Sequence, residues 1–351
     1  MSSMTSRQRI LAAKEGERPD RVPVSPFGLG HLDPTGSVAA EFIARTDPFL
    51  TAGLGGNPFV GTRLETAVQQ VGDETITRIQ TPSGSLVQRY RRTDITGCMV
   101  EFPCKDAQDV EAYLAIPFVA AVPQVETFRE RRTEVGDEAL LLAGIGDAIC
   151  LPATILSPED MCLLSIDAPD LLRRCVQVAH ERLMDFVDLA CRAGVDAFRI
   201  VGGEYATEQL GPAGFENFVR PWDTELVSLI HDHGALAYYH NHGYVDSYLE
   251  TFADLDIDFL DPLEVPPYGN VDLGDAHRRI GDRVCLVGGL DDMEVLETCD
   301  EATVRRMGRA HLEEVGHESG FCLGGTASGT FTEVAARNFI ALAEESKNFC
   351  R

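Results

Sequence analysis

The sequence predicts a single (β/α)8 barrel, or TIM barrel, that takes up residues 1–351. From residue 140 onward, short β-rich runs alternate with helical stretches, which is typical of a parallel sheet with crossover helices. Six clear strands and one or two weaker ones suit an eight-stranded barrel better than an open sheet. No G-x-G-x-x-G sequence follows the first predicted strand, which disfavours a dinucleotide-binding fold.

The elements follow in order along the chain. A helix is predicted over residues 6–15 and a first strand over residues 21–24. Residues 60–135 are harder to read, but the runs 75–80 and 85–91 are joined by Pro82-Ser83-Gly84 and predict an inserted β-hairpin near residues 75–91. The later strands are predicted at 140–143, 197–201, 235–240, 258–260, 283–287 and 321–323, with long helices at 169–192 and 215–233.

The charge balance limits the classes of partner. The chain has 30 Lys and Arg residues against 56 Asp and Glu residues, a net charge of −26. Such a surface repels phosphate backbones and anionic lipids, so neither nucleic acid nor a membrane is an expected partner. The chain also contains no apolar run long enough to span a bilayer, and its first residues lack the apolar core of a signal peptide. We therefore expect a cytoplasmic protein that acts on a small molecule.

Two histidines stand at the end of one predicted strand, where a barrel of this kind carries its functional residues. In His240-Asn241-His242, side chains alternate along extended backbone, so the two histidines fall on the same side. Imidazole nitrogens suit zinc, and a carboxylate commonly completes a catalytic site with three protein ligands. Glu204 follows the preceding strand and Glu264 the next one, so either acid can be the third ligand. We expect a metal site made by His240, His242 and Glu204.

Glu204 is preferred because it follows two glycines, whereas Glu264 lies in a loop stiffened by prolines. Glu264 then remains the alternative ligand or a proton carrier, and Asp261 is the other candidate catalytic acid. Simpler interpretations stay open. The histidines can be hydrogen-bonded rim residues, Glu204 can favour a helix N-terminus, and Asp261, which precedes a proline, can fix a turn.

Several motifs together resemble the uroporphyrinogen decarboxylase-like superfamily, whose members are (β/α)8 barrels. The resemblance covers nearly the whole chain, and its motifs are diffuse but ordered. They are Arg7-Gln8-Arg9-Ile10-Leu11-Ala12-Ala13, Pro19-Asp20-Arg21-Val22-Pro23-Val24, Gly84-Ser85-Leu86, Ala197-Phe198-Arg199-Ile200, His240-Asn241-His242-Gly243 and Asn338-Phe339.

Two branches of that superfamily differ after the first strand. Decarboxylases of uroporphyrinogen carry an Arg-Gln-Ala-Gly-Arg run there, whose arginines bind substrate carboxylates. This chain has Ser25-Pro26-Phe27-Gly28-Leu29-Gly30-His31, with no arginine. In a chain of net charge −26, little is left to bind an eight-fold carboxylate, so that activity is disfavoured.

The corrinoid-dependent methyltransferases form the other branch and carry His-x-Cys-Gly after the fifth strand and Gly-Cys after the eighth. Here His242 replaces the first cysteine, and Thr326-Ala327-Ser328 stands where the second is expected, while Cys322 is nearby within a strand and is expected to be core. A His/His/carboxylate site is harder than a cysteine site and suits polarising an oxygen better than activating a thiol.

The resemblance therefore implies a zinc-dependent methyltransferase that moves a methyl group between a small O-methylated or related substrate and a corrinoid. The chain has no D-x-H-x-x-G run of a corrinoid module, so cobalamin would be carried by a separate protein. Two alternatives remain. The first is a decarboxylase or other metal-free lyase on the same barrel, and the second is a non-catalytic barrel that binds a tetrapyrrole or a corrinoid protein.

Overall fold

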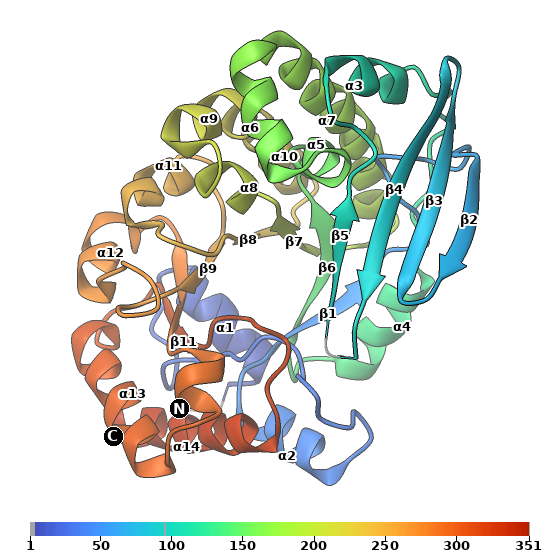
Figure 1. Cartoon of the computed structure of the whole chain (residues 1–351). Coiled ribbons are helices and arrows are strands. Elements are labelled where there is room, and N and C mark those ends of the chain that lie inside the picture. Colours follow the sequence, from blue (N-terminus) through green and yellow to red (C-terminus); the bar gives the residue numbers. More distant parts are fainter. Residues whose placement is uncertain (1–3, 95, 351) are drawn as a thin grey trace.

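A curled parallel sheet forms the centre of the computed structural model, which describes residues 4–94 and 96–350 (Figure 1). Each of its seven strands is paired in parallel with the next, and helices surround the sheet, which makes the fold TIM-barrel-like. In order around the sheet the strands are β1 (Phe49–Gly53), β6 (Leu140–Gly146), β7 (Ala197–Val201), β8 (Leu236–His240), β9 (Phe259–Leu263), β10 (Cys285–Gly289) and β11 (Phe321–Gly324).

The segment 23–27 joins the two edges of this sheet. Val24 forms a parallel bridge with Leu323 in β11, and Phe27 forms one with Phe49 in β1. The expected first strand over residues 21–24 is therefore reduced to two isolated bridges. The prolines at 23 and 26 explain this difference, because they have no N–H to donate to a ladder, although their carbonyl groups accept hydrogen bonds from both neighbouring strands.

The six strands predicted after residue 140 are all present, whereas β1 was missed because Phe-Leu-Thr-Ala-Gly is a short run with small residues at its end. The helix predicted over 169–192 is α7 (Pro169–Arg192). A single helix over 215–233 was wrong, because the chain forms α9 (Gly211–Phe218) and α10 (Arg220–Asp232). Pro221 lies at the start of α10, where its missing N–H and its ring prevent a continuous helix.

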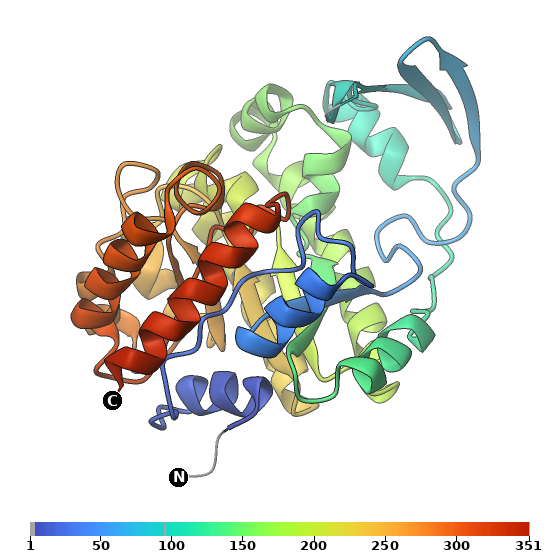
Figure 2. The ribbon, with the colours of Figure 1, turned by 90° about the horizontal axis from the view of Figure 1, so that it is seen from below.

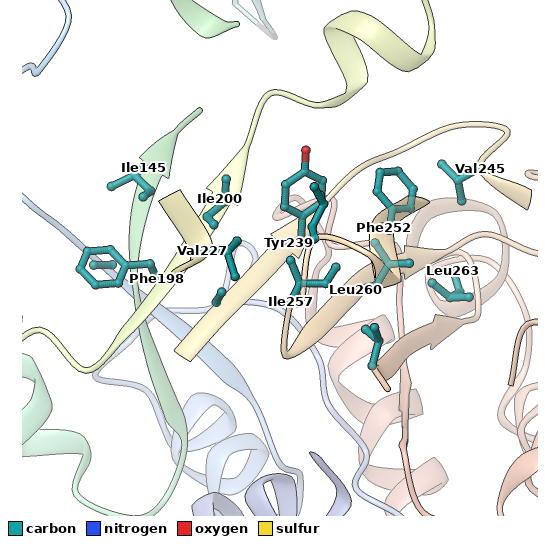
Figure 3. Close-up of a cluster of buried hydrophobic side chains, with 14 of the residues drawn as sticks. Ile145, Phe198, Ile200, Val227, Tyr239, Val245, Phe252, Ile257, Leu260 and Leu263 are labelled. Atoms are coloured by element: carbon teal, nitrogen blue, oxygen red, sulfur yellow. The ribbon is translucent and has the colours of Figure 1, made fainter. Parts of the chain in front are cut away.

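The outward faces of the strands pack against the helices (Figure 3). Phe198, Tyr239 and Leu260, for example, belong to a buried cluster with Val227 of α10 and Phe252 of α11. The remaining helices are α1 (Ser6–Lys14), α2 (Ser37–Arg45), α3 (Ala107–Leu114), α4 (Glu126–Val135), α5 (Cys150–Ile155), α6 (Pro158–Asp167), α8 (Glu204–Thr207), α11 (Leu249–Ala253), α12 (Leu273–Ile280), α13 (Glu301–Val315) and α14 (Glu333–Phe349), with short turns η1 (Asp246–Tyr248) and η2 (Asp292–Leu296). Within residues 4–94 and 96–350, none of the helices is long and apolar enough to cross a membrane.

A second, smaller cluster fills the inside of the barrel. Every strand contributes at least one inward side chain to it: Phe49, Leu140, Leu142, Ala197, Tyr238, Phe259, Cys285, Val287 and Cys322. Ile10 and Ala13 of α1 belong to the same cluster, so α1 covers one end of the barrel (Figure 2). With that end closed, only the carboxyl ends of the strands remain to form a site.

A four-stranded antiparallel sheet is inserted between β1 and β6 and projects from the barrel (Figure 2). Its strands are β2 (Thr66–Val71), β3 (Glu74–Thr81), β4 (Gly84–Arg92) and β5 (Gly97–Glu101). The middle pair, β3 and β4, turns at Pro82-Ser83-Gly84, the feature that the sequence marked as a hairpin near residues 75–91. Both flanking strands lay in the region that the sequence left unassigned.

Candidate functional site

The inward-facing residues at the mouth of the barrel are exposed on the strands β1 and β6 and buried on the strands β8 and β9. Two residues beyond the inner cluster, the next inward positions are Thr51, Gly144, Arg199, His240 and Asp261. Thr51 and Gly144 are exposed and Arg199 is half-buried, whereas His240 and Asp261 are buried. A Cβ atom built on Gly144 would meet no atom within 4 Å, so this side of the mouth has room for a ligand.

His240 and Asp261 form a buried pair on neighbouring strands. His240 ends β8 and is directly opposite Asp261 in β9, so the strand register brings the two side chains together. His240 Nδ1 lies 2.9 Å from Asp261 Oδ1, and Asp261 is only 1% exposed. Because an ionised carboxylate can only accept, the hydrogen bond places the imidazole proton on Nδ1 and leaves Nε2 with its lone pair.

His242 and Glu264 form a second pair, closer to solvent. His242 Nδ1 lies 3.3 Å from Glu264 Oε1, and the other oxygen of Glu264 accepts a hydrogen bond of 2.9 Å from the backbone N–H of Gly243. Burial by itself lowers the pKa of His242, but the hydrogen bond and charge of Glu264 outweigh it and raise that pKa. The ring of His242 stands perpendicular to that of His240, with 4.6 Å between the ring centroids.

These two pairs bear directly on a zinc site. Histidines that bind a metal usually donate their other ring N–H to a carboxylate, which orients the ring and sets its tautomer. Both His240 and His242 have a carboxylate on Nδ1, so both Nε2 atoms remain as potential donors of the kind zinc prefers. The histidine pair therefore fits two positions of a zinc site, and Asp261 and Glu264 orient the rings.

Glu204 is not brought to the histidines. It begins α8, and its carboxylate accepts a hydrogen bond of 3.0 Å from the N–H of Gly202 in its own loop. Within residues 4–94 and 96–350, no three His, Cys, Asp or Glu side chains gather closely enough to hold a metal ion. The third predicted ligand thus lies near the pair without joining it, and its charge contributes to the raised pKa of His242.

A buried polar cluster behind the mouth was not found from the sequence. Asp147 follows β6 and Asp223 lies in α10, and both are almost fully buried. The Tyr239 hydroxyl donates a hydrogen bond of 2.7 Å to Asp223. Burial raises the pKa of Asp223 to about 7, and burial together with the charges of Asp223 and Glu204 raises that of Asp147 well above its usual range. A Cβ atom on Gly202 would overlap Asp147 Oδ1, so this cluster requires a glycine at position 202.

The loop after β11 lies where the resemblance expects a second cysteine. The buried carboxylate of Asp292 accepts hydrogen bonds from the N–H groups of Thr326, at 3.1 Å, and Ser328, at 2.9 Å. This pairing fixes the loop and holds Ala327 at a φ of 55°. Cys322 is fully buried inside the barrel, as expected for a core residue.

Comparisons with known proteins agree with this architecture. A family model described as uroporphyrinogen decarboxylase (URO-D) matches residues 77–349. Among solved structures, a methyltransferase from Methanosarcina mazei superposes with a TM-score of 0.67 at 17% identity, covering 97% of this chain and 99% of that one, which shows the shared fold. A B12-independent methionine synthase from Shewanella sp. W3-18-1 is much less similar, with a TM-score of 0.40 at 12% identity over 81% of this chain and 74% of that one. No curated protein sequence matches the chain.

The family model spans well over half of the chain and includes β6 to β11, which carry the histidines, their acids and Glu204. By this match, the chain belongs to the uroporphyrinogen decarboxylase (URO-D) family.

Proposed function

We propose that this chain is a zinc-dependent methyltransferase that moves a methyl group between a small O-methylated or related substrate and a corrinoid carried by a separate protein. One observation carries the proposal: His240 and His242 each have a carboxylate on Nδ1, which leaves both Nε2 atoms without a carboxylate partner, on rings whose centroids lie 4.6 Å apart. The fold that the chain shares with the Methanosarcina mazei methyltransferase supports the reaction class.

The charges at the mouth favour this reaction over decarboxylation of uroporphyrinogen. Glu204, Glu208 and Glu264 lie around the histidine loop, where Glu208 approaches the N–H of Tyr244. On the inner wall of the described strands, Arg199 is the one arginine that faces the mouth. A single guanidinium among several carboxylates is poorly suited to a substrate with eight carboxylates, because the remaining negative charges would repel one another.

The roles of the residues follow from their contacts. His240 and His242 would bind the zinc ion through Nε2. Glu204 would be the third ligand after its carboxylate released the N–H of Gly202, to which it is hydrogen-bonded in the structure, and turned toward the histidines. Bound there, zinc would supply Lewis acidity toward an ether or hydroxyl oxygen. Asp261 accepts a hydrogen bond from Nδ1–H of His240 and so orients its ring. Glu264 accepts one from Nδ1–H of His242 and another from the backbone N–H of Gly243. Glu264 is the more exposed of the two acids and is the candidate proton carrier.

A second candidate function is metal-free proton transfer, as in a decarboxylase or other lyase. The buried His240–Asp261 pair favours it, because an aspartate that orients the Nδ1–H of a histidine leaves Nε2 ready to take or give a proton. Metal content separates the two functions, since proton transfer by this pair requires no bound ion.

The test measures zinc and methyl transfer in the same preparations. Purified protein, His240→Ala and His242→Ala are compared for zinc per chain, for thermal unfolding, and for transfer of a methyl group from an added small methyl ether to an added corrinoid protein, followed by the absorbance of the corrinoid. His233→Ala is the matched control, because His233 also pairs with a carboxylate, at 2.9 Å from Asp188, but lies just beyond the end of α10.

We expect about one zinc per chain in the unaltered protein and in the control, and loss of zinc and of transfer in both site variants. The unfolding temperature should change little in His242→Ala, whose side chain is partly exposed, and should fall in His240→Ala, which leaves the buried Asp261 without its partner. Methyl transfer by zinc-free protein would remove zinc from the proposed reaction, whereas zinc-free protein that transfers no methyl group would favour the metal-free proton-transfer alternative. Full zinc content in either site variant would remove that histidine from the ligand set.

A further inference from the structure

Arg199 is a charged residue inside the barrel that has no charged partner within residues 4–94 and 96–350. It lies in the middle of β7, where Phe198 and Ile200 face the helices and Arg199 faces inward. Its guanidinium lies 4.3 Å from the centre of the Phe27 ring, inside the barrel. The part of the chain that the structure describes offers it no ion pair or hydrogen bond, and its Nε atom is buried without a partner.

Partial burial of the Arg199 guanidinium lowers the stability of the fold unless another group forms hydrogen bonds with it. A half-buried arginine loses part of its hydration, and a cation–π contact replaces only part of that loss. The chain has 56 acidic residues, and most of the other arginines pair with one of them. Arg199 is instead in register with the exposed Gly144 of the neighbouring strand, and added atoms at Gly144 or Gly53 would meet nothing within 4 Å.

We propose that Arg199 is the anchor of a substrate subsite that binds one carboxylate, or a similar small monoanion, at the floor of the barrel mouth. A planar guanidinium matches a carboxylate through two parallel hydrogen bonds, and the Phe27 ring behind it fixes its plane. The hydroxyl of Tyr238, the residue in register with Arg199, is buried without a hydrogen-bond partner among the described residues and is a further donor for such a ligand.

The position of Arg199 also orients the substrate. Arg199 is in register with Tyr238, and His240 lies two residues further toward the mouth on the same neighbouring strand. An anion bound to Arg199 would therefore leave the rest of the molecule on the side of the histidines. This inference rests on the proposed function for the identity of the reacting group, and it narrows the substrate class to small monocarboxylates whose methyl-bearing oxygen lies at the end away from the carboxylate.

Equilibrium binding tests the subsite without requiring turnover. Benzoate and benzamide have nearly the same shape and differ in charge, so calorimetric titration with each isolates the contribution of the anion. The variants are Arg199→Gln and Arg199→Lys. Arg182→Gln is the matched control, because Arg182 is also half-buried over an aromatic ring, that of Phe118 at 3.9 Å, but belongs to α7.

We expect the unaltered protein and the Arg182→Gln control to prefer benzoate by about tenfold to a hundredfold, the range of a charge-assisted hydrogen bond. Arg199→Gln should bind the two compounds equally, and Arg199→Lys should retain part of the preference. Thermal unfolding of each variant shows whether it is folded. Equal binding by the unaltered protein, no detectable benzoate binding at millimolar concentration, or an unchanged preference in a folded Arg199→Gln would overturn the proposal.

The same titration in His240→Ala separates this inference from the proposed function. A preference for benzoate that persists in that variant comes from Arg199 and not from a bound metal. It would stand even if the purified protein contained no zinc. A preference that is lost in His240→Ala and kept in Arg199→Gln would assign carboxylate binding to the metal site instead.

Discussion

Replacement of Asp223 by asparagine tests the buried carboxyl cluster behind the barrel mouth. Burial raises the pKa of Asp223 from its ordinary 3.8 to about 7, and the side chain is 1% exposed. Between these two values the folded protein keeps a proton that the unfolded chain has lost. The free energy of unfolding is therefore greatest below about pH 4 for this group, and it falls as the pH rises to about 7. A difference of about three pKa units corresponds to roughly 4 kcal/mol.

Asparagine keeps the shape and can still accept the hydrogen bond from Tyr239, but it has no proton to lose. Asp223→Asn should therefore become more stable relative to the unaltered protein by up to roughly 4 kcal/mol between about pH 4 and pH 8. Asp147 also contributes to the pH dependence of the unfolding free energy, because its own pKa is raised partly by the charge of Asp223.

Urea unfolding at several pH values measures this difference, because groups common to both proteins cancel. Asp232→Asn, at the exposed end of the same helix α10, is the matched control and should run parallel to the unaltered protein. If the stability difference between Asp223→Asn and the unaltered protein is the same at pH 5 and pH 8, Asp223 does not hold a proton in the folded state and the reasoning fails.

Two further predictions concern the reaction. Glu204→Gln should reduce zinc content, whereas Glu264→Gln should keep the metal and lose turnover. Zinc content and methyl-transfer rates of both variants test this assignment. The reverse result would make Glu264 the ligand and Glu204 the proton carrier. If neither variant changes, neither acid belongs to the site. The purified protein should not convert uroporphyrinogen at a useful rate, because residues 25–31 contain no arginine and the inner wall offers only Arg199. Turnover comparable to that of a dedicated decarboxylase, measured by product fluorescence after oxidation, would contradict the choice of reaction.

Much of the barrel could be predicted because its strands are buried on both faces. Runs such as Ala197–Val201 and Cys285–Gly289 are short, apolar and bounded by helical stretches, and these local features suffice to locate them. The segment 23–27 and β1 were harder, because prolines in the first and small residues in the second remove the usual strand pattern. The break between α9 and α10 was missed as well. Pro221 is compatible both with the first turn of a new helix and with a kink in a longer one, and only the structure shows that a new helix begins there.

The candidate site could also be predicted in part from the sequence, and the rest depends on the tertiary structure. The spacing in His240-Asn241-His242 and the outlet positions of Glu204, Asp261 and Glu264 are properties of the chain itself, and they identified the region from sequence alone. Which acid meets which histidine depends on the register between β8 and β9, where His240 is opposite Asp261. That register, and the loop hydrogen bond that keeps Glu204 on Gly202, arise only when separate segments pack together.

The sequence by itself determined the barrel class, the strand ends and the two histidines, because periodicity and residue type act over a few neighbouring positions. Only the tertiary structure decided that Asp223 is buried near Asp147, and that Arg199 faces inward without an acidic partner among the residues that the structure describes. An aspartate within an amphipathic helix and an arginine within an apolar strand are each compatible with several surroundings. Their chemistry depends on the solvent exposure and charges contributed by residues far away in the chain, and closure of the barrel brings those residues together.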